Sequence, residues 1–132
     1  MDMNWYKSLN RSKLTPPSWV FAPAWTILYI TIFISFVVLV KDGTTGGDIN
    51  TKIPQLLLFC LQLGLNLVWP KLFFGKHLIG LSLIDILLLW VVIFFTIISF
   101  WQVSHLAAIL LIPYFLWVSF ASYLNYKIFV LN

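Results

Sequence analysis

Four long apolar runs restrict this chain more than any other feature of its sequence. They cover residues 19–40, 53–74, 78–101 and 106–130. Each holds about 20 residues or more, the length at which an α-helix crosses the roughly 30 Å hydrocarbon core of a bilayer. Of the 132 residues, 61% are hydrophobic and 9% charged, which leaves too little polar surface for a water-soluble globule. The sequence predicts an all-α, polytopic membrane protein with four spans in the lipid bilayer.

The connections between these runs predict one compact helix bundle. Residues 41–52, KDGTTGGDINTK, are rich in glycine, threonine and charge, as expected of an exposed loop. The other two connections, GKH at 75–77 and QVSH at 102–105, are short and make successive helices antiparallel neighbours. Residues 1–132 are therefore expected to form a single transmembrane domain.

The basic residues predict how the bundle is oriented. The net charge is only +4, too sparse for a nucleic-acid footprint, so no nucleic-acid partner is expected. Lys41 and Lys52 fall on one side of the bilayer. Six others share the opposite side: Lys7, Arg11, Lys13, Lys71, Lys76 and Lys127. The positive-inside rule then places both termini in the cytoplasm.

The second run carries polar and aromatic side chains along one helical face. Gln62, Asn66, Trp69 and Phe73 are four, three and four residues apart, which aligns them on one side of a helix. An asparagine in lipid needs a partner. Asn66 either bonds to a neighbouring helix or orients a ligand that Trp69 and Phe73 flank.

The last run repeats this arrangement with a small residue. Trp117, Ala121 and Asn125 recur every four residues and place an indole beside a notch. The notch either allows close helix packing or seats an apolar ring.

The same run also matches a loose sterol-contact pattern. Val118, Tyr123 and Lys127 have the spacing of that pattern, which often occurs by chance.

Asp85 is the one acidic residue inside an apolar run. Intramembrane acids are costly and suggest function. Asp85 either pairs with a basic residue such as Lys76 or Arg11, or contacts a ligand.

The remaining tryptophans and histidines do not indicate a metal site or a catalytic site. Trp90 and Trp101 are candidates for interfacial anchors, as are Trp5, Tyr6 and Trp19. His77 and His105 stand alone at run ends, so neither a metal site nor a resident cofactor is expected. No nucleophile is followed by a recognisable base, so conventional catalysis is not predicted.

Three segments together resemble the TspO family, the tryptophan-rich sensory proteins related to the mitochondrial translocator protein. They are WYKSLNRSKLTPPSWVFAPAWTILY at 5–29, QLGLNLVWPKLFF at 62–74 and LLIPYFLWVSFASYLNYKI at 110–128. SLIDILLL, at 82–89, is similar to the acid-bearing start of the family's fourth helix. Two differences stand out. The family's first helix, which precedes the Trp-Tyr pair, has no counterpart before Trp5, and Leu14 stands where many members carry a tryptophan.

The resemblance implies a five-helix, usually homodimeric bundle that binds porphyrins, haem precursors, sterols and drug-like aromatic molecules between its helices. It implies a multi-pass protein of a bacterial inner membrane, in preference to the mitochondrial outer membrane. Carried over by motif, the ligand-binding residues lie on a lid and three walls. They are Tyr6 on the lid, and Trp25, Asn66, Trp69, Phe73, Trp117 and Ala121 below it.

Three functions are consistent with this resemblance. The leading hypothesis is a receptor or carrier of flat hydrophobic ligands with a transport or sensory role. The alternative is light- and oxygen-dependent porphyrin degradation, with Trp25 and Trp117 as the reactive indoles. A small proton-coupled drug exporter is less favoured, because such exporters depend on a membrane glutamate and this sequence has none.

Overall fold

A computed structural model describes residues 21–41 and 52–131. Tyr6, Arg11 and the proline pair at 16–17 lie outside the described residues. The described elements, in chain order, are α2 (Phe21–Lys41), α3 (Ile53–Pro70), the π-helical turn η3 (Lys71–Gly75), α4 (Ile79–Trp101), α5 (His105–Leu110) and α6 (Ile112–Leu131).

The four predicted spans are confirmed. Four helical stretches of the described chain are long and apolar enough to cross a membrane: Pro23–Lys41, Ile53–Gly75, Ile79–Trp101 and His105–Leu131. The regular structure in these ranges is helical throughout. The chain is therefore an all-α, multi-pass membrane protein.

The last span is divided between α5 and α6. Helix α5 begins after Ser104, whose Oγ accepts a hydrogen bond from the Ala107 amide at 3.3 Å. It ends before Leu111, and Pro113 stands in the first turn of α6. Proline has no amide to donate into the preceding turn but is well accepted in the first turn of a helix. Pro113 therefore explains why one apolar run gives two helices.

The turn after α3 ends in an unusual backbone conformation. The π-helical turn η3 follows Pro70, and His77 then adopts a positive φ of 56°. A single left-handed residue stops a helix and redirects the chain. The chain can thus reverse within a few residues and enter α4 antiparallel to α3.

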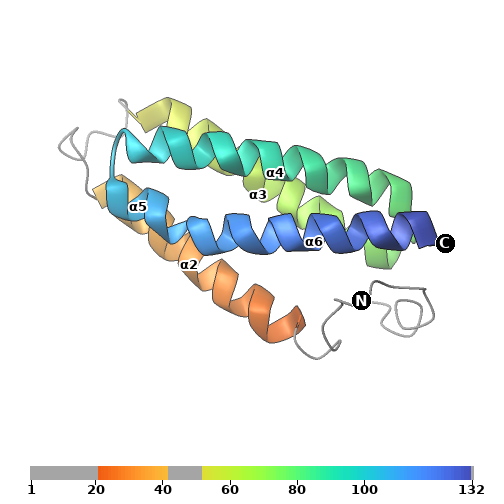
Figure 1. Cartoon of the computed structure of the whole chain (residues 1–132). Helices are drawn as coiled ribbons and strands as arrows, with labels where there is room; N and C mark the ends of the chain where they lie inside the picture. Colours follow the sequence, from red (N-terminus) through yellow and green to blue (C-terminus); the bar gives the residue numbers. More distant parts are fainter. Residues whose placement is uncertain (1–20, 42–51, 132) are drawn as a thin grey trace.

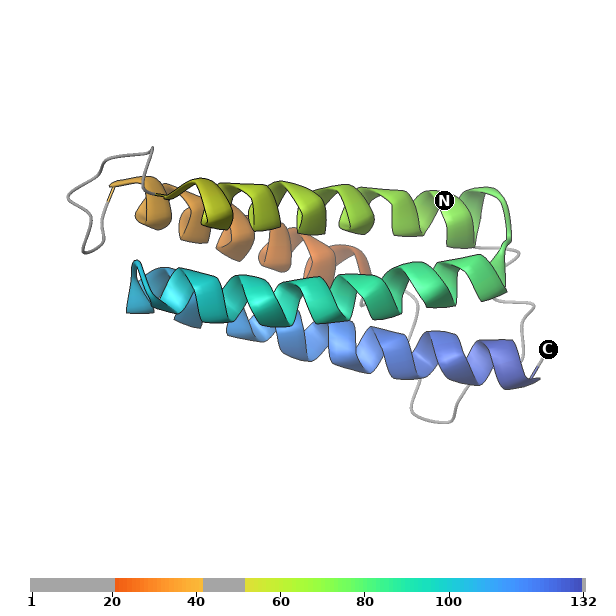
Figure 2. The same cartoon turned by 90° about the horizontal axis from the view of Figure 1, so that it is seen from above.

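Helix α4 packs between α3 and α6, and α2 packs chiefly against α5. Small side chains at Ala107 and Ala108 are buried where α5 meets α2, and Ser35 Oγ donates to the Ala107 carbonyl oxygen at 2.7 Å. From this contact, α2 runs obliquely to α6, and the two helices diverge toward the start of α2 (Figure 1). Figure 2 shows α3, α4 and α6 running side by side.

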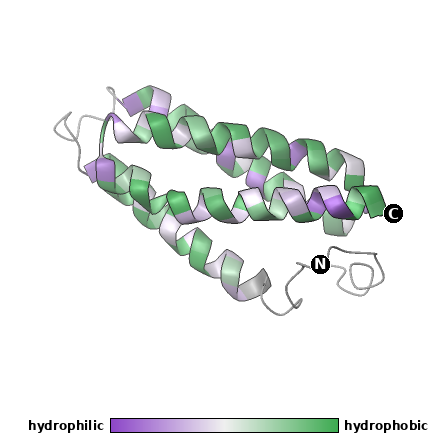
Figure 3. Ribbon diagram, viewed as in Figure 1, coloured by the Kyte–Doolittle hydropathy of each residue, from purple (hydrophilic) through white to green (hydrophobic). Residues whose placement is uncertain are grey.

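Apolar residues cover the outside of the bundle as well as its inside (Figure 3). Phe33, Leu57 and Leu116 each expose more than 60% of their surface, as expected of side chains that face lipid tails. Burial of apolar surface adds little to helix association in lipid, so close packing and interhelical hydrogen bonds hold the helices together. The hydrogen bonds inside this bundle are concentrated around the predicted site.

Candidate ligand-binding site

Three tryptophans from three helices meet inside the bundle. Trp25 of α2 lies with its ring centroid 6.3 Å from that of Trp69 on α3 and 6.2 Å from that of Trp117 on α6. The Trp25 and Trp117 rings meet edge to face, at 85°. Trp69 is buried and stacks on Phe73 at 5.1 Å, whereas Trp25 and Trp117 are half-buried. We call Trp25, Trp69 and Trp117 the tryptophan cluster.

A chain of four polar side chains lies next to this cluster. Tyr29 donates its hydroxyl proton to Asn66 Oδ1 at 2.6 Å, and Asn66 Nδ2 donates to the Tyr114 hydroxyl oxygen at 2.7 Å. Tyr114 in turn donates to Gln62 Oε1 at 2.8 Å. The Tyr29 ring lies 6.0 Å from that of Trp25. We call these four residues the polar chain.

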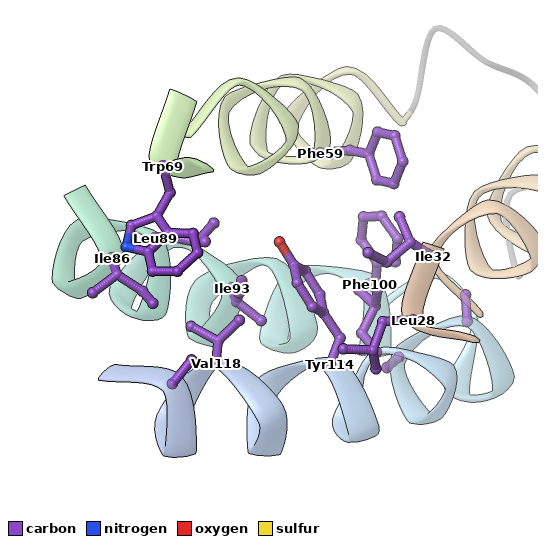
Figure 4. Close-up of a cluster of buried hydrophobic side chains, with 14 of the residues drawn as sticks. Leu28, Ile32, Phe59, Trp69, Ile86, Leu89, Ile93, Phe100, Tyr114 and Val118 are labelled. Atoms are coloured by element: carbon purple, nitrogen blue, oxygen red, sulfur yellow. The ribbon is translucent and has the colours of Figure 1, made fainter. Parts of the chain in front are cut away.

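The polar chain joins helices far apart in sequence. Tyr29 comes from α2, Gln62 and Asn66 from α3, and Tyr114 from α6. In Figure 4 the Tyr114 hydroxyl points from α6 toward α3. Gln62, Asn66 and Tyr114 are each at most 1% exposed, so their hydrogen bonds are made away from water. Such bonds stabilise a membrane bundle by about 0.6–2 kcal/mol each.

A second hydrogen-bonded group holds Trp69 in place. Its indole Nε1 donates to Asn125 Oδ1 on α6 at 2.9 Å, and Ser82 Oγ on α4 donates to the same oxygen at 3.1 Å. Asn125 Nδ2 reaches the Ile79 carbonyl oxygen at 3.4 Å. Figure 4 shows the Trp69 indole beside Ile86 and Leu89 of α4. The orientation of this tryptophan is thus fixed from two other helices.

The structure places the other predicted ligand residues in or near these groups. The predicted face of the second span is confirmed, because Gln62, Asn66 and Trp69 of α3 and Phe73 of η3 are all buried. Ala121, one turn beyond Trp117, is 7% exposed and belongs to the buried core. Asn66 makes the interhelical bonds that one of its two interpretations predicted; its role toward a ligand stays a prediction.

Asp85 is buried without the ionic partner that we considered. It is 7% exposed, and its Oδ2 has no hydrogen-bond partner in residues 21–41 and 52–131. Lys76 is exposed and does not pair with it; Arg11 lies outside the described residues. The predicted pairing with Lys76 is therefore wrong, because Lys76 lies in the turn before α4, whereas Asp85 points into the bundle.

The sterol-contact pattern does not form one surface. Val118 is fully buried, whereas Tyr123 is 39% exposed. Lys127 Nζ lies 5.9 Å from the centre of the Tyr123 ring, so these two residues share the outer face. Tyr123 stands five positions after Val118 on the helix, which turns the two side chains to different sides. A sterol on the outer surface could not touch all three residues.

Trp90 is not an interfacial anchor. It lies at the middle of α4, where its indole Nε1 donates to Ser119 Oγ of α6 at 2.7 Å and its ring stacks on Phe115 at 5.2 Å. An indole N–H in hydrocarbon needs such an acceptor. Trp101, by contrast, ends α4, is 49% exposed and stacks on His105 at 3.8 Å.

Sequence reasoning missed Tyr29 and Tyr114. Both stand in long apolar runs, and their hydrogen-bond partners in the polar chain come from other helices. Their one signal was a hydroxyl at membrane depth, which requires an acceptor. In the described residues, no group of three His, Cys, Asp or Glu side chains could hold a metal ion.

The described helices define a multi-pass membrane protein whose interior offers indole rings and uncharged hydrogen-bonding groups. Residues 1–131 match the TspO/MBR family, and the chain belongs to that family. It is 41% identical over 128 residues to the tryptophan-rich protein TspO of Chlorobaculum tepidum, covering 97% of this chain and 79% of that protein. It is 38% identical over 124 residues to the translocator protein of Sus scrofa, and the alignment covers 94% of this chain and 72% of that protein. Protein CrtK of Rhodobacter capsulatus is 32% identical to it over 128 residues, and the alignment covers 97% of this chain and 78% of CrtK.

Proposed function

We propose that this protein is a membrane receptor or carrier for flat hydrophobic ligands, with porphyrins and haem precursors as the main class and sterols as a second. The observation that carries this proposal is the convergence of Trp25, Trp69 and Trp117 from three helices, with ring centroids 6.2–6.3 Å from Trp25. Aromatic walls with a few placed polar groups suit a flat ligand. Its rings would stack on the indoles.

The composition of the site favours binding over acid–base chemistry. The tryptophan cluster and the polar chain contain no charged side chain, and Asp85 is not matched by a second acid at membrane depth. General acid–base catalysis works best with a positioned group whose pKa lies near the working pH, and the tryptophan cluster and the polar chain contain no His, Asp, Glu or Lys. The names of the relatives, translocator protein and tryptophan-rich sensory protein, support a role in transport or sensing.

A second candidate function is light- and oxygen-dependent breakdown of a bound porphyrin. The edge-to-face contact of Trp25 with Trp117, at 6.2 Å, favours it, because two indoles at one position would both lie beside the excited ligand. Binding alone would leave the porphyrin unchanged under illumination. Degradation would consume it.

A titration of intrinsic tryptophan fluorescence with protoporphyrin tests both functions. The purified protein in nanodiscs is titrated in the dark, with empty nanodiscs as the control for partition into lipid. We expect saturable quenching, because the three indoles would be in contact with the bound ring. Quenching no greater than in the control would eliminate the proposed site. The same samples are then illuminated in air, and loss of porphyrin absorbance that requires the protein would support degradation.

We propose further that the protein is a homodimer in a bacterial inner membrane with both termini in the cytoplasm. Lys71 and Lys76 lie in the connection between α3 and α4, at the same end of the bundle as the end of α6, which carries Lys127 (Figure 2). Lys41 and Lys52 lie at the other end. The excess of lysine at the first end supports a cytoplasmic location for it.

A further inference from the structure

The polar chain has a direction, and it ends in an unused donor. Each member donates a hydrogen bond to the next: Tyr29 to Asn66, Asn66 to Tyr114, and Tyr114 to Gln62. The last member accepts through Oε1, so its Nε2 group is left to donate. Among the described residues, Gln62 Nε2 has no hydrogen-bond partner.

An unused amide at this depth is costly. Gln62 is 1% exposed, so water from the membrane surface does not solvate it, and a buried donor without an acceptor destabilises a fold. Rotating the Gln62 amide alone would place Nε2 toward Tyr114 and break the bond that Tyr114 donates. In the direction in which the polar chain runs, the amide thus keeps its N–H groups available, which is the arrangement of a preorganised binding group.

The position of Gln62 relates this donor to the tryptophan cluster. Gln62 stands one helical turn before Asn66 and two turns before Trp69 on the same buried face of α3. At 1.5 Å per residue, the rise from Gln62 to Trp69 is roughly 10 Å. A ligand stacked on Trp69 with a side arm of a few atoms could therefore reach Gln62.

We infer that Gln62 is a specificity-determining residue that donates a hydrogen bond to an uncharged carbonyl oxygen on the side arm of a flat hydrophobic ligand. This inference rests on the proposed function and names the chemistry of the ligand. The acceptor at Gln62 must be uncharged because the four members of the polar chain are uncharged, and a carboxylate in a low-dielectric interior without a cationic partner is strongly disfavoured. The ionised carboxylates of a ligand such as protoporphyrin would have to lie away from the polar chain. Esters, amides and ketones meet this requirement.

Two matched porphyrins test the inference in the wild-type protein. Etioporphyrin carries alkyl groups alone, and mesoporphyrin dimethyl ester has the same ring with two ethyl groups replaced by ester-bearing arms. We expect the ester to bind about tenfold more tightly, the factor that corresponds to about 1.4 kcal/mol for one hydrogen bond. Equal saturable affinities would overturn the inference and leave the proposed function intact. No saturable binding of either porphyrin would overturn both.

The Gln62→Met variant then assigns the preference to this residue. Methionine keeps the length of the side chain and removes the donor, so the ratio of the two affinities should fall to within about twofold of one. Gln55→Met is the matched control, because Gln55 is also buried on α3 but its Nε2 already donates to the Ser99 carbonyl oxygen at 3.2 Å. Its ratio should stay at the wild-type value.

The ratio of affinities keeps the result independent of general damage to the site. A variant that loosens the bundle weakens both porphyrins equally and leaves the ratio unchanged. If Gln62→Met does not fold, Gln62→Leu serves in its place. An unchanged ratio in a folded Gln62 variant would show that the ester preference arises elsewhere and would overturn the inference.

Discussion

Trp69 of α3 donates its indole N–H to Asn125 Oδ1 of α6 at 2.9 Å. Both side chains are buried, at 8% and 1% exposed. The bond connects two spans that are not consecutive in the chain, and the same asparagine oxygen accepts the Ser82 hydroxyl from α4. One amide therefore ties three helices together on one side of the tryptophan cluster.

Replacing this amide should destabilise the bundle. In Asn125→Leu the Trp69 indole loses its acceptor, whereas Ser82 keeps its bond to the Ile79 carbonyl oxygen. We expect a loss of about 1–2 kcal/mol and a lower melting temperature in detergent. Tyr126→Leu, at the exposed neighbouring position, is the control and should melt near the wild-type temperature. Equal melting of both variants with the wild type would show that the bond to Asn125 contributes nothing.

The contact of Asn66 with Tyr114 can be measured with a double-mutant cycle. Asn66→Leu removes the partner of two hydroxyl groups, and Tyr114→Phe removes one of them. We expect each single variant to lower the melting temperature. The double variant should lose less than the sum, with a coupling of about 1 kcal/mol. Strict additivity would mean that the 2.7 Å contact does not contribute to stability.

The same Asn66→Leu sample separates the two interpretations of the asparagine. If its amide orients a ligand, porphyrin affinity falls about tenfold beyond the loss seen for Tyr114→Phe. If the amide serves only to join the helices, the two variants weaken porphyrin binding to the same extent, because each breaks the bond between Asn66 and Tyr114. Both affinities are measured by fluorescence quenching.

Tryptophans inside and outside the cluster should differ in their effect on binding. Trp69→Phe removes an indole that would stack on the ligand, and we expect affinity for protoporphyrin to fall about tenfold, within the range for stacking on an aromatic ring. Trp90→Phe removes an indole of α4 that lies outside the tryptophan cluster and bonds to Ser119. The affinity of the Trp90→Phe variant for protoporphyrin should not change. Equal losses in the two variants would indicate that the porphyrin is not held at the cluster.

The sequence was sufficient to predict the spans and one buried face. Hydropathy identifies lipid-crossing helices because each span must satisfy its own backbone, and helical spacing brought Gln62, Asn66 and Trp69 to one side of α3. The partners of that face could not be predicted. Tyr29 and Tyr114 reach Asn66 through the way α2 and α6 dock, and docking depends on packing across the whole bundle.

The misassignment of Trp90 has a related cause. Tryptophan is common at membrane interfaces, but a tryptophan at the middle of α4 is tolerated here because Ser119 of α6 lies opposite and accepts its proton. That serine gives no signal of its own, since a hydroxyl on a helix usually bonds to the carbonyl one turn before, as Ser119 also does to Phe115. Such a pair becomes visible when the two helices are placed together.

The orientation of the bundle can be tested with reporter fusions in a bacterial host. A green fluorescent protein fused after residue 132 should fluoresce, and alkaline phosphatase at the same site should be inactive, because the lysines at this end of the bundle favour the cytoplasm. Phosphatase inserted between residues 42 and 51 should be active, which controls for expression and folding of the enzyme. Lys71→Gln combined with Lys76→Gln weakens the charge difference between the two sides and should produce a mixed population. An active phosphatase after residue 132 in the unaltered chain would reverse the assigned orientation and place the start of α2 on the opposite side of the membrane.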